Sequence, residues 1–267
     1  MHKIRTYNAI SSKGLDRFPA DKYSVAADCA APEGYLLRSQ KLHTEEVPAS
    51  LLAVARAGAG TNNIPTANYT EQGIVVFNTP GANANAVKEL IVAGLLLGSR
   101  DIFGGMNYVQ ELGHMDDSGE MGKLLEKEKK RFAGTEVVGK TLGVVGLGAI
   151  GSIIANLALD LGMNVIGYDP AISVEAAWQL SSRVERMESI EALLGRADFI
   201  TLHVPAIAAT KHLINKETLS LMKPTAKILN FAREEIVSTE DMVAALDAGT
   251  IAGYISDFPA PALLGRK

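Results

Sequence analysis

The sequence predicts an α/β fold of two parallel-sheet domains with a cleft between them. Short apolar, β-rich runs alternate with helical stretches along most of the 267 residues. Most of these runs are apolar at every position, which is typical of strands covered on both faces. One of them leads into a glycine turn, GLGAIG at residues 146–151, and then into a helix. Together these features indicate Rossmann-like or flavodoxin-like domains.

The first third of the chain contains five predicted strands and two predicted helices. The strands are expected at residues 4–10, 23–28, 35–39, 51–58 and 74–78. A short helix is expected at 44–50, where Thr44 can cap the N-terminus and Glu45 and Glu46 lie in the first turn. One long, largely apolar helix is expected at 83–100. The polar stretch 101–140, which contains a charge-rich helix, is interpreted as the joint between the domains.

The rest of the chain repeats the alternation more clearly. Strands are predicted at 141–146, 164–168, 198–202, 226–230 and 251–256, and helices at 150–161, 174–181, 189–195, 215–222 and 239–248. Ser238 or Thr239 is a suitable N-cap for the last helix, and Gly249 is suited to end it.

Composition excludes several classes of function. The net charge is −4 and no basic stripe is visible, so neither nucleic acid nor an anionic membrane is an expected partner. The longest apolar run, residues 90–97, is too short to span a bilayer, and the N-terminus has no signal-peptide core. Cys29 is the only cysteine, so disulfide frameworks and zinc clusters are excluded, and no metal site is predicted. A cytoplasmic protein is expected.

The glycine turn predicts a dinucleotide site. Gly146 permits the tight turn, Gly148 lets the backbone approach a pyrophosphate, and Gly151 lets the helix pack against the strand. The helix N-terminus offers N–H groups to the phosphates. Asp169 ends the next predicted strand, 21 residues after Gly148, where a carboxylate would bind the adenosine ribose and favour NAD over NADP. The alternative is an ordinary α/β turn with an Asp-Pro stop.

Two further motifs resemble the D-2-hydroxyacid dehydrogenase family. LLGRADFITLHVPAIAATKHLIN at 193–215 is similar to the second signature of that family, with Asp198, His203, Pro205 and Thr210 in place. MKPTAKILNFAREEIV at 222–237 is similar to the third, with Asn230, Ala232 and Arg233. Stretches of the first third, such as YLLRSQKLHTEE and VARAGAGTNNI, resemble the branch that acts on D-3-phosphoglycerate. The resemblance covers nearly the whole chain.

The resemblance implies hydride transfer between C2 of the substrate and C4 of the nicotinamide of NAD. It implies a substrate-binding domain at 1–96, whose closing segment is missing, and an NAD-binding Rossmann domain at 97–267. Arg233 would be the catalytic residue that holds the substrate carboxylate and carbonyl; a structural salt bridge is the alternative. The implied cofactor-binding residues are Gly146, Gly148, Ala149, Ile150, Gly151, Asp169, His203, Val204, Pro205, Thr210, Phe231, Ala232, Asp257 and Val87. His203 would line the cofactor pocket rather than act as the acid–base catalyst.

The implied substrate-binding residues lie in the first domain: Arg38, Ser39, Arg56, Ala59, Gly60 and Asn83. Arg38 and Arg56 are the candidates for a substrate phosphate, with surface or packing arginines as the alternative. Backbone N–H groups of Ala59 and Gly60 would bind the carboxylate, unless they form only a plain glycine turn. Asn78 and Thr79 are expected on the same side, in a loop facing the cleft.

The family's proton relay, a His paired with a Glu, is not recognisable. The Glu is expected five residues after Asp257, where Ala262 stands, and the His is expected beyond Lys267. Either the chain is part of a longer enzyme, which we favour, or it is a short protein that binds NAD without efficient catalysis. Two positions of the third signature also depart from the family, Glu234 for Gly and Ser238 for Asp, and Lys227 replaces an apolar strand residue whose place its stem could fill.

Three functions are therefore compared. The first is NAD-dependent oxidation of D-3-phosphoglycerate, early in serine synthesis. The second is reduction of glyoxylate, hydroxypyruvate or another 2-oxoacid, and the third is non-catalytic NAD binding on the same fold. The partners expected are a small-molecule substrate and a second copy of the chain, in a homodimer formed through the NAD-binding domain.

Overall fold

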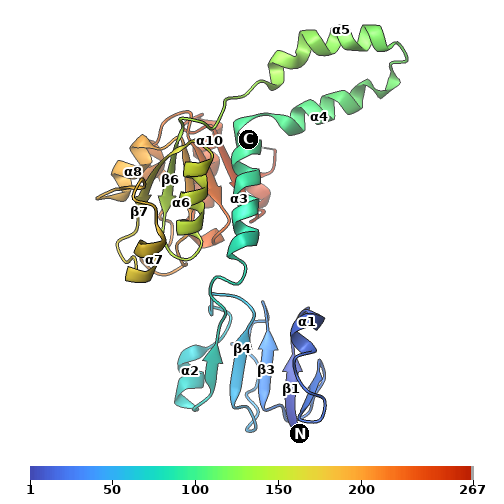
Figure 1. Ribbon diagram of the computed structural model, residues 1–267, viewed down its shortest axis with the longest axis vertical. Coiled ribbons are helices and arrows are strands. Elements are labelled where there is room, and N and C mark those ends of the chain that lie inside the picture. Colours follow the sequence, from blue (N-terminus) through green and yellow to red (C-terminus); the bar gives the residue numbers. More distant parts are fainter. Residues whose placement is uncertain (266–267) are drawn as a thin grey trace. The chain divides into compact units, whose positions relative to one another are not determined.

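The computed structural model describes residues 1–265, which divide into two units. Unit 1 is Met1–Asn83, and unit 2 begins at Ala84 (Figure 1). Each unit contains its own parallel sheet and its own core. The α/β class of the fold is therefore confirmed.

Unit 1 is built on a five-stranded sheet in the order β2-β1-β3-β4-β5, in which all pairs are parallel. The strands are β1 (His2–Thr6), β2 (Tyr23–Ala26), β3 (Gly34–Leu37), β4 (Ala53–Arg56) and β5 (Val75–Phe77), and the helices are α1 (Ser12–Leu15) and α2 (Thr66–Glu71). All five predicted strands are present, but they are shorter than predicted because their last residues turn into loops. The core lies on one face of the sheet and includes Leu37, Val54 and Tyr69, none of which has appreciable solvent exposure.

The prediction of a helix at residues 44–50 is wrong. These residues form turns, although Thr44, Glu45 and Glu46 are a plausible helix start. Pro48 disfavours a helical conformation at the residue before it. The loop instead connects the buried Leu42 and Leu51, and Val47 packs against the same core.

Unit 2 is built on a six-stranded parallel sheet in the order β11-β10-β9-β6-β7-β8. Its strands are β6 (Thr141–Val145), β7 (Asn164–Tyr168), β8 (Glu185–Arg186), β9 (Phe199–Leu202), β10 (Lys227–Asn230) and β11 (Gly253–Ser256). Its longer helices are α3 (Ala84–Ser99), α4 (Ile102–Glu111), α5 (Ser118–Glu128), α6 (Gly151–Asp160), α7 (Val174–Gln179), α8 (Ile190–Arg196), α9 (Lys216–Ser220) and α10 (Thr239–Asp247). The five predicted strands and five predicted helices of this region are all found, whereas the two-residue β8 was not foreseen.

Helix α3 packs on the sheet of unit 2. Ile91 and Leu95 are buried in a core that also contains residues of β6, β7 and α6. A Cβ added at Gly94 would lie 3.0 Å from a Leu229 methyl group, and one at Gly98 would lie 2.7 Å from a methyl group of Ile255. The division between the units therefore lies before α3, at 83/84, rather than at the predicted position 96/97 within the helix.

Lys227 begins β10 beneath this helix. Its Cδ lies 3.7 Å from where a Cβ at Gly98 would be, and its ammonium lies 5.8 Å from the centre of the Phe199 ring. Burial lowers the pKa of Lys227, and Lys140 adds to this effect. The lysine stem thus packs where an apolar side chain was expected.

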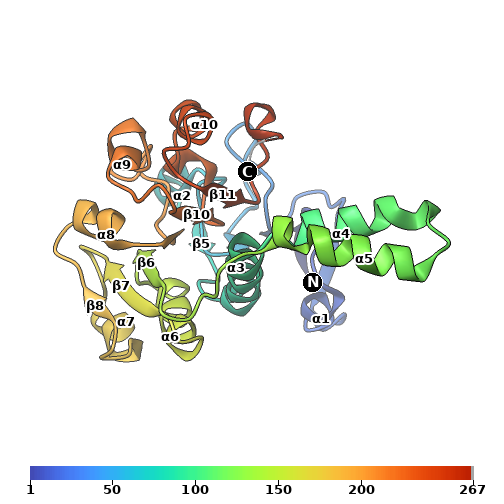
Figure 2. The same cartoon turned by 90° about the horizontal axis from the view of Figure 1, so that it is seen from above.

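Helices α4 and α5 run side by side as a hairpin that precedes β6 (Figures 1 and 2). Asp101 caps α4 by accepting from the Gly104 N–H, and Asp117 caps α5. Tyr108 and Phe132 pack together at a centroid distance of 5.5 Å, with the Arg131 guanidinium over both rings. Neither helix contains a buried residue. Within the described residues 1–265, no helix is both long and apolar enough to cross a membrane.

Candidate functional site

The glycine turn lies between β6 and α6, and each glycine has a distinct steric requirement. Gly146 has a φ of 90°, and a Cβ there would lie 2.7 Å from the His203 carbonyl oxygen. A Cβ at Gly151 would lie 1.9 Å from the Gly146 carbonyl oxygen, so this position admits only glycine. A Cβ at Gly148 would meet no atom within 4 Å. Gly146 and Gly151 are thus required by the fold, whereas Gly148 borders open space.

The helix α6 begins three residues after that open position. Ile150 occupies the N-cap position and provides no side-chain cap. The Ser152 N–H donates to the Gly148 carbonyl at 3.0 Å. Unpaired N–H groups and the positive end of the helix dipole favour an anion such as a phosphate here.

Asp169 follows β7 and is hydrogen-bonded to the glycine turn. Its Oδ2 accepts from the Leu147 N–H at 2.8 Å, and its Oδ1 accepts from the Ala171 N–H at 2.9 Å. Each carboxylate oxygen can accept a second hydrogen bond. The carboxylate is therefore fixed next to the turn with acceptor capacity left for two ribose hydroxyls.

His203 follows β9 on the other side of the turn. The structure places its Nε2 2.9 Å from Oγ1 of the buried Thr201. Burial lowers the pKa of His203 to about 4, so the imidazole is neutral at pH 7. The Val204 side chain lies 3.0 Å from where a Cβ at Gly146 would be.

The loop after His203 is closed by Thr210. Its hydroxyl accepts from the Ile207 N–H at 3.0 Å and donates to the Pro205 carbonyl. Thr210 thus shapes the loop that contains Pro205, and its hydroxyl is engaged within it.

Arg233 follows β10, where Asn230 fixes the turn. Asn230 is fully buried; its Nδ2 donates to the Arg233 carbonyl at 2.9 Å, and its Oδ1 accepts from the Ala232 N–H at 3.2 Å. The Arg233 Nη1 donates to the Ala232 carbonyl at 2.6 Å. The guanidinium is thereby held over the strand end, beside Phe231. Asp257, after the neighbouring strand β11, is exposed.

In unit 1, the loop after β3 carries Arg38 and Ser39 and is supported from both sides. Oδ1 of Asn8 accepts from the N–H groups of Arg38, Ser39 and Gln40, at 3.3, 2.9 and 2.9 Å. Nδ2 of the buried Asn63 donates to the carbonyls of Arg38 and Gln40. The Arg56 Nε also donates to the Arg38 carbonyl, at 2.9 Å. Most of the polar backbone of this loop is therefore paired.

The loops after β4 and β5 are joined to each other. The Thr79 hydroxyl accepts from the Gly58 N–H at 2.7 Å, and the Thr79 N–H donates to the Gly58 carbonyl at 3.0 Å. Asn78 Nδ2 donates to the Ala59 carbonyl at 2.7 Å. These contacts define the turn that contains Ala59 and Gly60 at the carboxyl edge of the sheet.

A cavity of about 680 Å³ lies beside the β3 loop within unit 1. Its walls are mainly apolar and come from the 9–11 loop, α1, Phe18, Leu36 and Ala57. Arg38 is the one charged residue that lines it.

Comparison with known proteins identifies the family of the chain. Residues 105–263, more than half of the sequence, match the model of the D-isomer specific 2-hydroxyacid dehydrogenase, NAD binding domain. The chain belongs to the D-2-hydroxyacid dehydrogenase family. The matched residues all lie in unit 2.

Similar sequences in the family carry two kinds of name. The chain is 39% identical over 238 residues to D-3-phosphoglycerate dehydrogenase of Synechocystis sp., an alignment that covers 88% of this chain and 40% of that protein. It is 40% identical over 201 residues to the protein of the same name from Methanocaldococcus jannaschii, covering 75% and 36%. It is also 38% identical over 212 residues to hydroxypyruvate reductase of Thermotoga maritima, covering 76% and 63%. The chain thus spans about 40% of the length of the first of these relatives.

Solved structures of the family share the fold over almost the whole chain. Apo D-mandelate dehydrogenase of Rhodotorula graminis has a TM-score of 0.77 at 25% identity, covering 99% of this chain and 85% of that one. A glyoxylate/hydroxypyruvate reductase from Sinorhizobium meliloti has a TM-score of 0.81 at 22% identity, covering 99% and 84%, and supports the fold alone.

Most of the predicted cofactor residues converge at one edge of the unit 2 sheet. The glycine turn, Asp169, the 203–205 loop, Phe231–Arg233 and Asp257 all follow the carboxyl ends of strands. The turn suits a pyrophosphate, because the position of Gly148 is open and the N-terminus of α6 follows it. The Asp169 carboxylate, bonded to the turn, suits the ribose hydroxyls instead. Val87 lies near the N-terminus of α3, where it packs against the core. Because Gly98 lies against Lys227 at the start of β10 and Gly94 against Leu229 and Phe231 at its end, this part of α3 lies toward the same edge.

The predicted substrate residues lie in unit 1, mainly on its loops, and Asn83 is the exposed last residue of that unit. Sequence reasoning missed Asn8, Asn63 and Thr201, which hold those loops and His203. Asn is a turn-forming residue, so Asn8 could have been recognised as the end of the strand predicted at 4–10, and its positive φ of 64° agrees with a turn. Asn63 and Thr201 give no comparable signal.

Proposed function

We propose that this chain binds NAD and contributes to the oxidation of D-3-phosphoglycerate to 3-phosphohydroxypyruvate. The observation that carries the proposal is the supported loop of Arg38. Asn8, Asn63 and Arg56 fix its backbone, which leaves the exposed guanidinium of Arg38 to bind a phosphate. The Synechocystis sp. relative named D-3-phosphoglycerate dehydrogenase aligns over 88% of the chain, which is long enough for the alignment to extend over this loop.

The residues have distinct roles in the proposed reaction. Arg233 binds the substrate carboxylate and polarises the C2 oxygen with its planar donor fork. Within unit 1, the N–H groups of Ala59 and Gly60 are donors suited to a carboxylate. The glycine turn and Asp169 hold the dinucleotide, which takes up the hydride from C2 when bound. The hydroxyl proton leaves to a base.

The first test compares phosphorylated and unphosphorylated acids. We expect Arg38→Ala to lower kcat/KM for 3-phosphohydroxypyruvate by about tenfold or more, the loss typical of a charged hydrogen bond, with little change for glyoxylate. NADH consumption in steady state measures both. Equal losses for the two substrates would exclude the phosphate assignment.

A reductase of hydroxypyruvate or glyoxylate is the second candidate. The Thermotoga maritima relative supports it, because it bears the name hydroxypyruvate reductase at 38% identity. Such a substrate carries no phosphate, so activity would persist in Arg38→Ala.

The proposed reaction needs a group that accepts the hydroxyl proton, and the His–Glu pair of the family is not recognisable in this sequence. Ala262 stands where the family has a Glu, and His203 is neutral and buried beside Thr201, so neither supplies an acid at pH 7. We expect the 267-residue polypeptide to bind NADH and to turn over poorly. NADH titration and steady-state assays on one preparation distinguish this outcome from normal catalysis. Binding without any turnover would favour the non-catalytic candidate.

The proposed partner is a second copy of the chain, which binds at the α4–α5 hairpin. Ile102, Phe103, Met106 and Val109 on α4 are exposed, and neither helix has a buried residue. Apolar side chains grouped on one helix are typical of an interface. A homodimer through the NAD-binding domain would cover them, and we propose a cytoplasmic location for it.

A further inference from the structure

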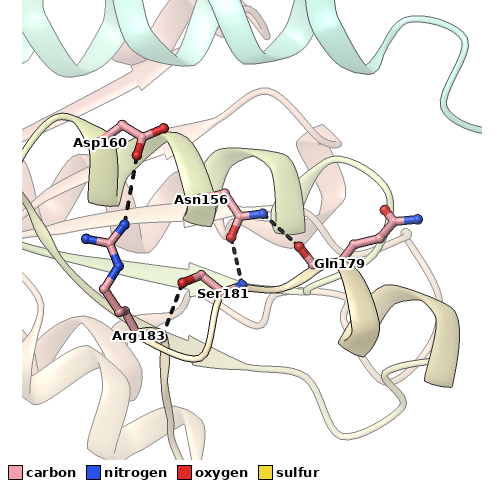
Figure 3. Close-up of polar contacts among 5 residues, drawn as sticks. All are labelled: Asn156, Asp160, Gln179, Ser181 and Arg183. Carbon is pink, nitrogen blue, oxygen red and sulfur yellow. Dashed lines mark hydrogen bonds and ion pairs between the residues drawn. The ribbon is translucent and has the colours of Figure 1, made fainter.

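Asn156, in the middle of α6, bonds two backbone groups of the chain that follows α7. Its Nδ2 donates to the Gln179 carbonyl at 2.8 Å, and its Oδ1 accepts from the Ser181 N–H at 2.9 Å (Figure 3). One amide thus satisfies a carbonyl and an N–H two residues apart. A side chain bonded in this way fixes both the position and the direction of the backbone it meets.

The segment 169–181 is consequently tied at both ends to the same turn and helix. At its start, Asp169 accepts from the Leu147 N–H in the glycine turn. At its end, Gln179 and Ser181 are held by Asn156. Between these ties, Ile172 and Leu180 pack against the core that also contacts Ile150.

We propose that Asn156 is a positioning residue for the adenosine half of the dinucleotide, which it serves by holding the segment that begins with Asp169. This proposal rests on the NAD site assigned above. The segment directly after the ribose-binding carboxylate flanks the adenosine, so its placement affects that half of the ligand first. A segment already fixed before binding loses less conformational entropy when the ligand arrives.

A second link between the same elements is available as a control. Arg183 and Asp160, one turn further along α6, form an ion pair at 3.9 Å (Figure 3). Both side chains are largely exposed, at 64% and 75%, and such pairs contribute little. Asp160→Asn therefore alters the same helix without releasing the backbone of the segment.

The test measures dissociation constants of NADH, ADP-ribose and AMP for the wild type, Asn156→Ala, Asn156→Asp and Asp160→Asn. We expect Asn156→Ala to weaken all three ligands by a similar factor of about tenfold, since all contain adenosine and the variant loses two hydrogen bonds. Asn156→Asp keeps the acceptor for Ser181 and should lie between wild type and Asn156→Ala. Asp160→Asn should bind like the wild type.

Trp178 provides an independent signal from within the segment. It is the only tryptophan of the chain, it neighbours Gln179, and it is 85% exposed. We expect its fluorescence anisotropy without ligand to fall in Asn156→Ala and to stay unchanged in Asp160→Asn. A role limited to overall stability would lower the melting temperature and leave anisotropy and affinity unchanged at temperatures far below it.

The outcomes distinguish the positioning role of Asn156 from the NAD site on which that role rests. If folded Asn156→Ala binds ADP-ribose within twofold of the wild type, or if Asp160→Asn is equally weakened, the role of Asn156 is wrong while the NAD site stands. If Asn156→Ala does not fold, the same comparison is made with Asn156→Asp. If the wild type binds neither NADH nor ADP-ribose, the NAD site is wrong and the role of Asn156 is wrong with it.

Discussion

Gly148 and Gly151 lie three residues apart in one turn, but the structure leaves room for a Cβ at Gly148 and none at Gly151. Gly151→Ala would place a Cβ 1.9 Å from a backbone oxygen, so we expect a loss of several kcal/mol in the free energy of unfolding, comparable to the overpacking of a core. Gly148→Ala meets open space, so its stability should stay within about 1 kcal/mol of the wild type. Its NADH affinity should nevertheless fall by about tenfold or more, because the methyl group occupies the place of the pyrophosphate. Urea unfolding and NADH titration of both variants measure this contrast, which a stable Gly151→Ala would contradict.

His203 makes the stability of unit 2 dependent on pH. The unfolded chain binds the proton near pH 6.5, whereas burial lowers the pKa in the folded protein to about 4. Between these values the unfolded state binds more protons, so the free energy of unfolding decreases as the pH falls from about 6.5 towards 4. The loss is at most about 3 kcal/mol, since each pKa unit corresponds to about 1.4 kcal/mol.

Urea unfolding at pH 7, 5.5 and 4.5 measures this loss in the wild type and in His203→Gln. The difference between the two proteins isolates His203 from the carboxylates that also titrate in acid. Parallel pH profiles would mean that the imidazole is protonated equally in both states.

At the scale of single elements, the stability of the short helix α9 depends on its N-cap. This five-residue helix begins at Asn215, whose Oδ1 accepts from the Glu217 and Thr218 N–H groups, while the Thr218 hydroxyl accepts from the Asn215 N–H. So short a helix is not stable alone, and the cap helps to keep Leu219 buried. We expect Asn215→Ala to lower the free energy of unfolding by about 1–2 kcal/mol.

Ser220→Ala is the matched control for this cap. Ser220 lies at the exposed end of the same helix, and its hydroxyl donates only to the Glu217 carbonyl. Its change should stay within about 0.5 kcal/mol. If both variants unfolded at the same urea concentration, the cap would contribute nothing.

A comparison of predicted and observed helices and strands shows where a sequence pattern is sufficient to locate an element. Except for β8, the strands of unit 2 were predicted within about two residues, since each is a mainly apolar run. The 44–50 segment failed because a correct local helix-start pattern was overridden by Pro48 and by the burial of Leu42 and Leu51. Helix α3 was located from its composition, but its membership of unit 2 depends on Gly94 and Gly98, which allow close contact with β10 and β11.

For the whole molecule, the exposed face of α4 should determine the oligomeric state. Phe103 and Met106 are 60% and 58% exposed. If a second copy covers them, replacing both with Asp would put charges in an apolar contact and convert a dimer of twice 28.3 kDa into a monomer. Light scattering coupled to size-exclusion chromatography measures the mass.

Val174→Asp is the control for this change, because Val174 is equally exposed but lies on α7. It should leave the mass unchanged. A wild type that is already monomeric at micromolar concentration would contradict the proposed interface.

The sequence by itself determined the two parallel sheets, the glycine turn, the position of Asp169 and the family, because these depend on residues within one strand–turn–helix unit. Only the tertiary structure decided which side chains support the site. Asn8 reaches a loop 30 residues away, Asn156 holds a segment 23 to 25 residues away, and burial lowers the pKa of His203. Such contacts join residues that no local pattern relates, since the folding of the sheet brings them together.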